Sequence, residues 1–188
     1  RKLALNVIIL GAGAPHSGEV PSALREPFSG TSVLQWLLDA CDCSIDAVTF
    51  VAGYQADAIR TRYPELKVVE NTEWQHTGSG ASLLTSPFAS ESPLLVCYSD
   101  ILFRNSVPKV LASCDEADIA VAWDSAWKNR YDARDGEDMA CCEKVVVKDD
   151  CILRLGADLP VDWASGEFIG LVRFSPQALK VLDRLRVD

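Results

Sequence analysis

The sequence predicts an α/β domain with a Rossmann-like, mostly parallel sheet sandwiched between helices. Short apolar, β-branched runs such as residues 7–10 have the length and composition of strands buried on both faces of a parallel sheet. Segments with apolar residues at helical spacing lie between these runs. A glycine-rich turn, residues 11–18, directly follows the first run. Strands that alternate with helices in this way are typical of right-handed βαβ units in an open sheet.

The composition indicates one domain and excludes nucleic acid as a bulk ligand. The chain has 188 residues, 48% of them hydrophobic, which is enough for one sizeable core and too little for two comfortable domains. Its formal net charge is −9, so it repels polyphosphate backbones. A small anion is still a feasible ligand, because it needs only a local cluster of donors and usually a metal.

The cysteines and the apolar runs indicate a cytoplasmic protein that is not in a membrane. The seven cysteines show neither metal-ligand spacing nor an even framework, so we expect free thiols. No apolar run approaches the ~20 residues that a membrane span requires. The chain starts at Arg1 and ends within a helical pattern, so we expect an excised piece of a longer protein with a partner domain. The oligomeric state is left open.

The first half of the chain alternates between strand and helix patterns. Pro64 and Pro87 end two of the helix patterns. Ser99 and Asp100 follow the last strand of this half, where α/β enzymes place ligand-binding side chains. The expected elements are a strand at 7–10, a helix at 33–41 capped by Thr31, a strand at 46–52, a helix at 54–63, a strand at 66–69, a helix at 81–84 and a strand at 93–98.

The second half continues with a polar segment and a hairpin pattern. Residues 124–142 combine many charged and aromatic side chains with no apolar period, so we expect a loop that recognises a ligand. Asp149 and Asp150 separate two short strand patterns as a two-residue hairpin turn. The expected elements are a helix at 107–114, a strand at 118–123, a hairpin at 143–155, a strand at 168–174 and a helix at 176–185.

The chemistry-bearing residues favour nucleotidyl transfer. Neither His16 nor His76 lies near a nucleophile motif, and the glycine turn matches neither a P-loop nor a GxGxxG dinucleotide site. What remains is a nucleoside triphosphate, a divalent cation on Asp100 and cationic groups from residues 124–144. In such a reaction the protein supplies alignment and charge neutralisation instead of a covalent nucleophile.

Several motifs lie in register along nearly the whole chain. They are Leu10-Gly11-Ala12-Gly13, Pro21-Ser22-Ala23-Leu24, Gly30-Thr31-Ser32-Val33-Leu34, Val51-Ala52-Gly53-Tyr54, Asn71, Gly80-Ala81-Ser82-Leu83, Ser99-Asp100, Asp124-Ser125-Ala126-Trp127, Glu143-Lys144 and Gly166-Glu167-Phe168-Ile169-Gly170. The earlier motifs resemble the nucleotidyltransferases that act on sugar phosphates and phosphocholine, and the motifs from Asp124 on resemble the cytidylyltransferases of phosphocholine or phosphonates. The resemblance implies a nucleotidyltransferase (GT-A-like) fold and Mg²⁺-dependent transfer of CMP from CTP to 2-hydroxyethylphosphonate with release of pyrophosphate. It also implies a fused second enzyme domain. Alternatives are a phosphocholine or sugar-phosphate nucleotidyltransferase and a non-catalytic CTP-sensing module.

This resemblance assigns three groups of site residues. The expected catalytic residues are Arg25, Lys144 and Asp100, and Asp100 is also the expected Mg²⁺ ligand. The expected nucleotide-binding residues are Leu10, Gly11, Ala12, Gly13, His16, Ser17, Gly18, Ser22, Gly78, Ser79, Gly80, Ser82 and Ser99. The expected acceptor-binding residues are Arg104, Asp124, Trp127, Asn129, Arg130, Arg134 and Glu167.

Three of these residues also have purely structural interpretations. Ser82 could cap a helix, Asp100 could cap a turn, and Lys144 could be an exposed strand lysine. Glu167 or Asp162 could supply a second carboxylate for the metal.

The chain departs from the family pattern at two cations that would contact the phosphates. The glycine turn has no Arg, and Ser22 stands where a Lys is expected. A triphosphate cannot leave water without counter-charge, so substitutes are needed. The expected substitutes are Mg²⁺ on Asp100, Lys144, Arg25, His16 and backbone N–H groups of residues 13–18.

Overall fold

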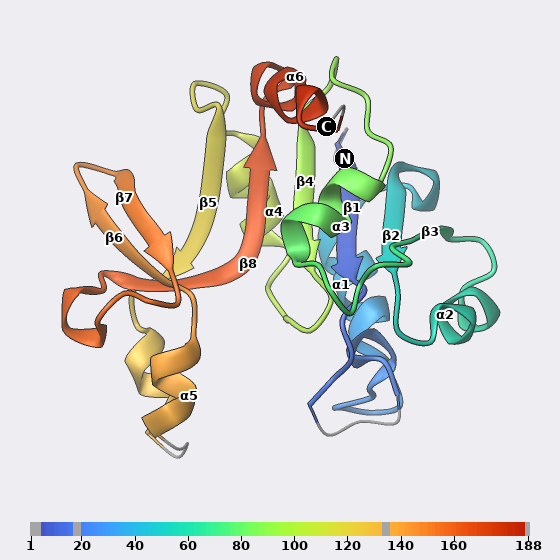
Figure 1. Cartoon of the computed structure of the whole chain (residues 1–188), viewed down its shortest axis with the longest axis horizontal. Helices are drawn as coiled ribbons and strands as arrows, with labels where there is room; N and C mark the ends of the chain where they lie inside the picture. The colour runs from blue at the N-terminus through green and yellow to red at the C-terminus, as the bar shows by residue number, and fades with distance from the viewer. Residues whose placement is uncertain (1–4, 17–19, 133–135, 187–188) are drawn as a thin grey trace. The chain divides into compact units, whose positions relative to one another are not determined.

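The computed structural model describes residues 5–16, 20–132 and 136–186, and the chain forms two compact units (Figure 1). The first unit consists of Arg1–Ala120 together with Val172–Asp188. The second unit is Val121–Leu171. The sequence prediction of a single continuous domain does not include this division.

The first unit is built on a parallel sheet. Its strands are β1 (Asn6–Gly11), β2 (Val48–Ala52), β3 (Lys67–Glu70) and β4 (Leu94–Tyr98), in the order β3-β2-β1-β4. All three neighbouring pairs run parallel, and the β1 backbone pairs with β2 on one side and β4 on the other. The central strands are buried, as their apolar runs predict.

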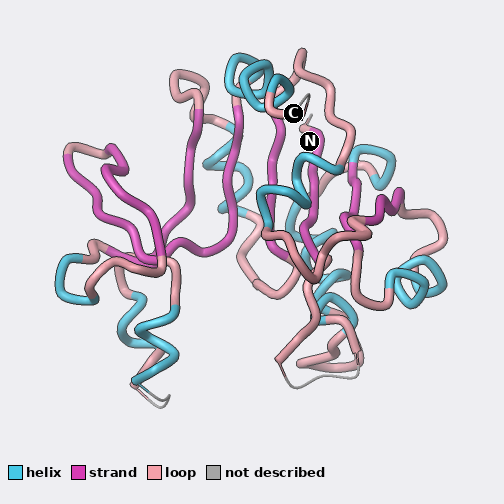
Figure 2. Tube along the Cα trace, in the orientation of Figure 1, coloured by secondary structure: helices cyan, strands magenta, loops and turns pink. Residues whose placement is uncertain are grey.

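Helices cover both faces of this sheet (Figure 2). On one face, Leu83 and Leu179 from two helices pack with Ile8, Leu10 and neighbouring strand residues in one buried cluster. On the other face, the Cys41 thiol of a third helix reaches Cys97 of β4. The helices of this unit are α1 (Val33–Cys41), α2 (Ala56–Arg62), α3 (Ser79–Thr85), α4 (Ser106–Ala112) and α6 (Pro176–Arg184). The predicted α/β architecture is confirmed.

Local capping corrects one prediction and explains two helix starts. The cap of α1 is Ser32, not Thr31, because the Ser32 hydroxyl accepts a hydrogen bond of 3.1 Å from the Gln35 backbone N–H. Ser175 caps α6 in the same way through Ala178, and Pro176 follows at the first helical position. No described helix has the length and apolar content needed to cross a bilayer.

The second unit contains an antiparallel hairpin of β6 (Lys144–Lys148) and β7 (Cys151–Gly156). Asp149 and Asp150 form its turn with φ of 51° and 59°, values that the turn type requires and that Asp tolerates. The strand β8 (Gly166–Phe174) pairs antiparallel with β6, so that Lys144 lies opposite Glu167. The strand β5 (Ile119–Asp124) enters this unit and pairs with β8.

The segment expected to be a loop at 124–142 is partly helical. It contains the 3₁₀ helix η3 (Trp127–Arg130) and the short helix α5 (Gly136–Cys141). The order comes from tertiary contacts: the Trp127 side chain is buried, and Lys144 binds carbonyl groups at the end of α5. A search for apolar periodicity cannot detect helices of this length, because they are too short to show a helical repeat.

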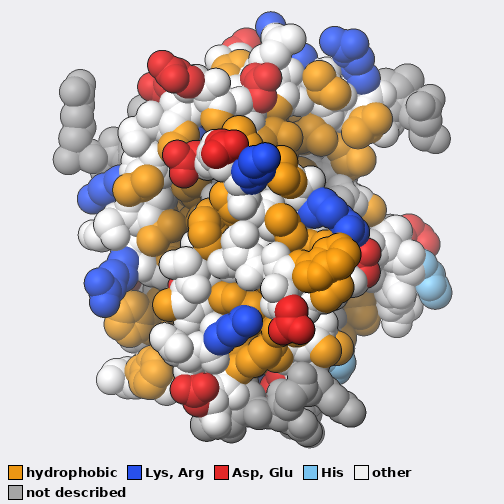
Figure 3. All heavy atoms as spheres, turned by 90° about the vertical axis from the view of Figure 1, so that its left-hand side faces the viewer, with side chains coloured by type: hydrophobic (Ala, Val, Ile, Leu, Met, Phe, Trp, Pro, Cys, Tyr) orange, Lys and Arg blue, Asp and Glu red, His pale blue; other side chains and the backbone are white. Residues whose placement is uncertain are grey.

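One face of the molecule, seen in Figure 3, mixes hydrophobic side chains with charges of both signs. Within the second unit, Leu153, Leu155 and Trp163 are among the exposed large hydrophobic residues. No broad field of one sign covers this face. Recognition of a small charged ligand there depends on local groups.

Candidate functional site

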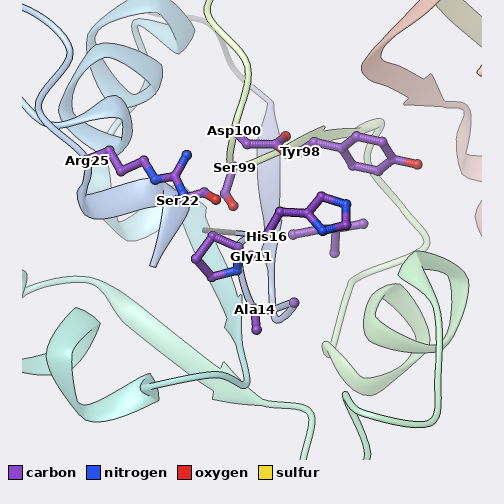
Figure 4. A pocket seen from close by; sticks show the side chains of 11 residues that line it. Gly11, Ala14, His16, Ser22, Arg25, Tyr98, Ser99 and Asp100 are labelled. Carbon is purple, nitrogen blue, oxygen red and sulfur yellow. The ribbon is translucent and has the colours of Figure 1, made fainter. Parts of the chain in front are cut away.

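A cavity of about 440 Å³ lies where the carboxyl ends of β1 and β4 meet the glycine turn. This is the position where open parallel sheets bind ligands. Figure 4 shows Arg25 and Ser22 on one side of the cavity and Tyr98 on the other, with Ser99 and His16 between them. The residues that line the cavity are Leu10, Gly11, Gly13, Ala14, Pro15, His16, Ser22, Arg25, Tyr98, Ser99 and Asp100.

Two glycines of the turn, Gly11 and Gly13, lie in different local environments. A Cβ on Gly11 would lie 2.3 Å from Phe50 Cζ and 2.7 Å from Ser99 Oγ, so only glycine fits there without a shift. A Cβ on Gly13 would meet nothing within 4 Å, so this residue leaves open space beside the backbone. Ala12, also predicted to bind nucleotide, is buried and does not line the cavity. Its carbonyl accepts a hydrogen bond from the Tyr54 backbone N–H.

The charged groups of the cavity are few and exposed. Arg25 follows the 3₁₀ helix η1 (Ser22–Leu24), and in the described residues it forms no ion pair. Its guanidinium is therefore available to an anion. His16 and Asp100 are exposed as well. The cavity offers one permanent cation, one imidazole and one carboxylate.

Asp100 fits a magnesium ion that is shared with a triphosphate. Within residues 5–16, 20–132 and 136–186 no group of three or more His, Cys, Asp or Glu side chains could hold a metal. Mg²⁺ in nucleotide sites usually keeps several waters and takes one or two carboxylates plus phosphate oxygens. Asp162 and Glu167 do not line the cavity, and both oxygens of Glu167 already accept hydrogen bonds from protein groups. Asp100 is therefore the carboxylate best placed for such an ion.

The start of α3 approaches the cavity through one contact. The Ser79 hydroxyl lies 3.4 Å from the Tyr98 hydroxyl, and Tyr98 lines the cavity. The flanking Gly78 and Gly80 are exposed and are absent from the lining. Gly78 is the N-cap residue of α3. Of the predicted 78–82 group, Ser79 is thus the member linked to the cavity.

Ser82 has a structural role that neither sequence interpretation describes. It lies inside α3, not at its cap, and it is buried. Asn71 donates one hydrogen bond of 3.0 Å to the Ser82 hydroxyl and another of 2.9 Å to Thr77 Oγ1. These bonds tie the 71–77 turn to the helix. The predicted contact of Ser82 with nucleotide stays a prediction, because Ser82 does not line the cavity.

Tyr98, Ala14 and Pro15 are cavity residues that the sequence analysis did not assign. Ala14 and Pro15 lie in the glycine turn, whose neighbours were assigned for their backbone. Tyr98 is the last residue of β4 and precedes Ser99 and Asp100. Its position at a strand end was a usable signal, since the carboxyl ends of parallel strands share one edge.

In the second unit, four predicted or neighbouring residues form a polar group that we call the acceptor cluster: Asp124, Arg130, Tyr131 and Glu167. Arg130 lies 3.1 Å from Asp124 Oδ2 and 2.7 Å from Glu167 Oε2. The Tyr131 hydroxyl donates to Glu167 Oε1 over 2.8 Å. Two carboxylates thus share one guanidinium, and the cluster keeps a surplus of negative charge.

Tyr131 is held as a neutral donor. Burial and the hydrogen bond to Glu167 raise the pKa of Tyr131 well above its usual range. Burial also raises the pKa of the neighbouring Cys142 thiol. Tyr131 packs edge-on against Trp127, whose side chain is 1% exposed. Trp127 therefore supports Tyr131 by packing, and its predicted contact with the acceptor stays a prediction.

Lys144 is completely buried, so the interpretation as an exposed strand lysine is wrong. Its ammonium donates hydrogen bonds of 2.7 Å to the Ala140 carbonyl and 2.8 Å to the Cys142 carbonyl. The predicted contact with an α-phosphate stays a prediction. Because the residue is completely buried, that contact would require the protein around the ammonium to move.

The remaining predicted residues are either exposed or outside the described residues. Asn129 and Arg104 are exposed. Arg104 does not line the cavity. Ser17, Gly18 and Arg134 fall outside the described residues.

Comparison with solved structures identifies the fold, whereas no protein-family model matches the sequence. The inositol-1-phosphate CTP transferase from T. maritima is 21% identical over 96% of this chain and 75% of its own, with a TM-score of 0.73. The fold is that of the nucleotidyltransferases. The CTP:phosphocholine cytidylyltransferase from Streptococcus pneumoniae is 16% identical over 96% of this chain and 75% of its own, with a TM-score of 0.56.

A third structure with the nucleotidyltransferase fold was solved with a nucleotide. The CMP:2-keto-3-deoxy-manno-octonic acid synthetase complexed with CTP is 12% identical over 96% of this chain and 78% of its own, with a TM-score of 0.62. The predicted GT-A-like nucleotidyltransferase fold is therefore confirmed. At these identities the likeness establishes the fold, and the chemistry has to be argued from this chain's own residues.

Proposed function

We propose that this protein is a Mg²⁺-dependent cytidylyltransferase that transfers CMP from CTP to a small phosphonate, 2-hydroxyethylphosphonate, and releases pyrophosphate. The observation that carries this proposal is the cavity at the carboxyl ends of β1 and β4, where Gly13, Arg25 and Asp100 come together in a nucleotidyltransferase fold. Its volume of about 440 Å³ lies within the range of small-molecule sites.

Several features of the cavity support binding of a triphosphate, although this chain lacks two cations of the family pattern, the Arg of the glycine turn and the Lys at the position of Ser22. The backbone beside Gly13 is open, so its N–H groups are accessible to phosphate oxygens. Arg25 adds a guanidinium with no ion pair of its own in the described part of the chain, and His16 adds an imidazole. In the proposed complex, Arg25 binds a phosphate oxygen, and Leu10, Gly11 and Gly13 face the base and the ribose.

In the proposed reaction a phosphonate oxygen attacks the α-phosphorus of CTP. One P–O bond forms to the phosphonate, the bond between the α-phosphorus and the β-phosphate oxygen breaks, and pyrophosphate carries away the electron pair. No covalent intermediate with the protein forms. The protein's contribution is to align the two anions and to neutralise their charge, and Arg25 performs the second task.

Asp100 is the residue that would hold Mg²⁺. When bound, the ion would neutralise charge on the phosphate oxygens. The Asp100 side chain is exposed at the mouth of the cavity, so it can accept a hydrated ion that arrives with the nucleotide.

The phosphonate acceptor is inferred from the later sequence motifs, which resemble phosphonate cytidylyltransferases. These motifs resemble those of the cytidylyltransferase domain of the bifunctional enzyme of fosfomycin biosynthesis. That resemblance also motivates a fused second enzyme domain, and the free cysteines motivate a cytoplasmic location. We propose that the acceptor cluster recognises the end of the acceptor that is remote from the phosphonate, through Asp124 and Glu167.

A second candidate acceptor, phosphocholine, is favoured by a specific observation. The acceptor cluster has two carboxylates for one guanidinium, and this surplus attracts a cationic group better than an uncharged hydroxyl. The buried position of Trp127 counts against an open aromatic cage formed with that residue.

Pyrophosphate release with each NTP and a panel of acceptors tests the proposal. The panel contains 2-hydroxyethylphosphonate, 2-aminoethylphosphonate, phosphocholine and glucose 1-phosphate. We expect CTP with 2-hydroxyethylphosphonate to have the highest kcat/KM, and omission of Mg²⁺ to abolish it. Preference for phosphocholine would establish the second candidate. CTP binding without turnover of any pair would indicate a CTP-sensing module and contradict an enzymatic role.

A further inference from the structure

We infer that Lys144 is a positioning residue: its buried ammonium fixes the end of α5 and, through Cys142 and Tyr131, the acceptor cluster. The inference rests on the proposed function only for what the cluster binds. The contacts themselves belong to the second unit and do not depend on the identity of the substrate.

The first step concerns the environment of the ammonium. Lys144 has no exposed surface, and an ammonium removed from water needs strong hydrogen-bond acceptors in return. The Ala140 and Cys142 carbonyls provide them at 2.7 and 2.8 Å. Carbonyl groups at the end of a helix carry partial negative charge and otherwise lack partners there. The buried ammonium therefore gains two hydrogen-bond acceptors, and the carbonyls at the end of α5 gain a donor.

The second step follows the contacts from Lys144 to the acceptor cluster. The Cys142 side chain hydrogen-bonds the Tyr131 side chain, and the Tyr131 hydroxyl donates to Glu167. Glu167 in turn pairs with Arg130. The backbone makes a second connection, because Lys144 lies opposite Glu167 in the β6–β8 pair. A change at Lys144 is thus transmitted to Tyr131 and Glu167 by direct contacts.

The third step separates this role from direct contact with a phosphate. A catalytic lysine has to present its ammonium to the reacting groups, and the Lys144 ammonium is enclosed by protein. The two carbonyl bonds leave one N–H of the ammonium, but contact with substrate would require the protein that encloses it to open. The geometry therefore favours support of the acceptor cluster over contact with CTP.

The test compares Lys144→Met with Lys148→Met by hydrogen–deuterium exchange, calorimetry and steady-state kinetics. Methionine keeps an unbranched chain of similar length and removes the ammonium. Lys148 lies on the same strand and is exposed, so it serves as the matched control. We expect Lys144→Met to speed amide exchange in residues 136–142 about tenfold or more. The acceptor KM should rise more than kcat falls, and the Kd for CTP should not change. Lys148→Met should match the wild type.

Two results with Lys144→Met would overturn the inference. Unchanged exchange at 136–142 together with a fall in kcat alone would make Lys144 a catalytic residue. Faster exchange throughout the chain with loss of CTP binding would make it a general stability residue. If Lys144→Met does not fold, Lys144→Gln takes its place, because its side-chain amide retains N–H donors without the charge. That variant should show intermediate exchange at 136–142, and wild-type exchange there would overturn the inference. Because exchange is measured without substrate, absence of turnover in the wild type would contradict the proposed function only.

Discussion

The hydroxyl of Tyr131 donates a 2.8 Å hydrogen bond to Oε1 of Glu167, while Oε2 of the same carboxylate faces Arg130 at 2.7 Å. Both oxygens of Glu167 are thereby fixed by protein groups. This arrangement orients Arg130, whose side chain is half exposed, and it makes the acceptor cluster a preformed site.

Tyr131→Phe should weaken both stability and acceptor binding. The variant removes a hydrogen bond to a carboxylate that is only 18% exposed, and such bonds contribute about 1.5–3 kcal/mol. We expect a loss of about 1–3 kcal/mol in the free energy of unfolding by urea titration, and a higher acceptor KM. Tyr54→Phe, in the first unit, is the control. A Tyr131→Phe protein with wild-type acceptor KM would show that the cluster does not bind the acceptor.

The raised pKa of Tyr131 predicts a specific loss of stability in alkali. Below the ordinary tyrosine pKa of 10.0 the phenol is neutral in both the folded and the unfolded state, so the contribution is complete. As the pH rises above that value the unfolded phenol ionises first, and stability is lost up to the folded pKa. The free energy of unfolding should therefore fall more steeply between about pH 9.5 and 11 in the wild type than in Tyr131→Phe. Parallel curves would refute the shift.

Asp100→Asn should abolish most Mg²⁺-dependent turnover without unfolding the protein. An ion that neutralises transition-state charge contributes several kcal/mol, so we expect kcat/KM to fall at least about a hundredfold. The side chain is exposed, and asparagine can still cap a turn, so stability should stay within about 0.5 kcal/mol. Asp46→Asn, at an exposed position in the 3₁₀ helix η2 (Ile45–Ala47) that precedes β2, is the control. Full activity in Asp100→Asn would show that Asp100 only caps the turn.

Gly11→Ala and Gly13→Ala should differ in stability although only one residue separates them. The new methyl at Gly11 would lie 2.3 Å from the Phe50 ring, and overpacking of this kind costs about 1–3 kcal/mol. The methyl at Gly13 meets nothing within 4 Å, so the fold should tolerate it while the Kd for CTP rises. Urea titration and calorimetry measure the two effects. Equal destabilisation by both variants would contradict the packing described for the turn.

The sheet and its edge were predictable because their signals are local. The buried runs of β1, β2 and β4 have the composition of parallel strands, and Asp149-Asp150 marks the hairpin turn. The site residues at strand ends, such as Ser99 and Asp100, follow from this topology and do line the cavity.

The acceptor cluster and its support were less predictable because they depend on long-range contacts. Nothing in the sequence pairs Tyr131 with Glu167, which are 36 residues apart. Lys144 was assigned a role without any sign that it would be buried, since one lysine in a short strand gives no information about the helix end that it meets. Trp127 was predicted to bind the acceptor from the family resemblance. In the structure its side chain is buried and packs edge-on against Tyr131, and no local sequence signal indicates that contact.

The central claim is that a cavity whose described lining residues include one permanent cation, Arg25, binds a nucleoside triphosphate. Calorimetric titration of the protein with CTP in the presence of Mg²⁺ tests it most directly, with Arg25→Gln as the matched variant. The account predicts saturable binding at one site, tighter for CTP than for ATP, GTP or UTP, and weakened at least about tenfold in Arg25→Gln, since a charge-assisted contact contributes about 1.5–3 kcal/mol. Absence of binding heat with every ribonucleotide would contradict it.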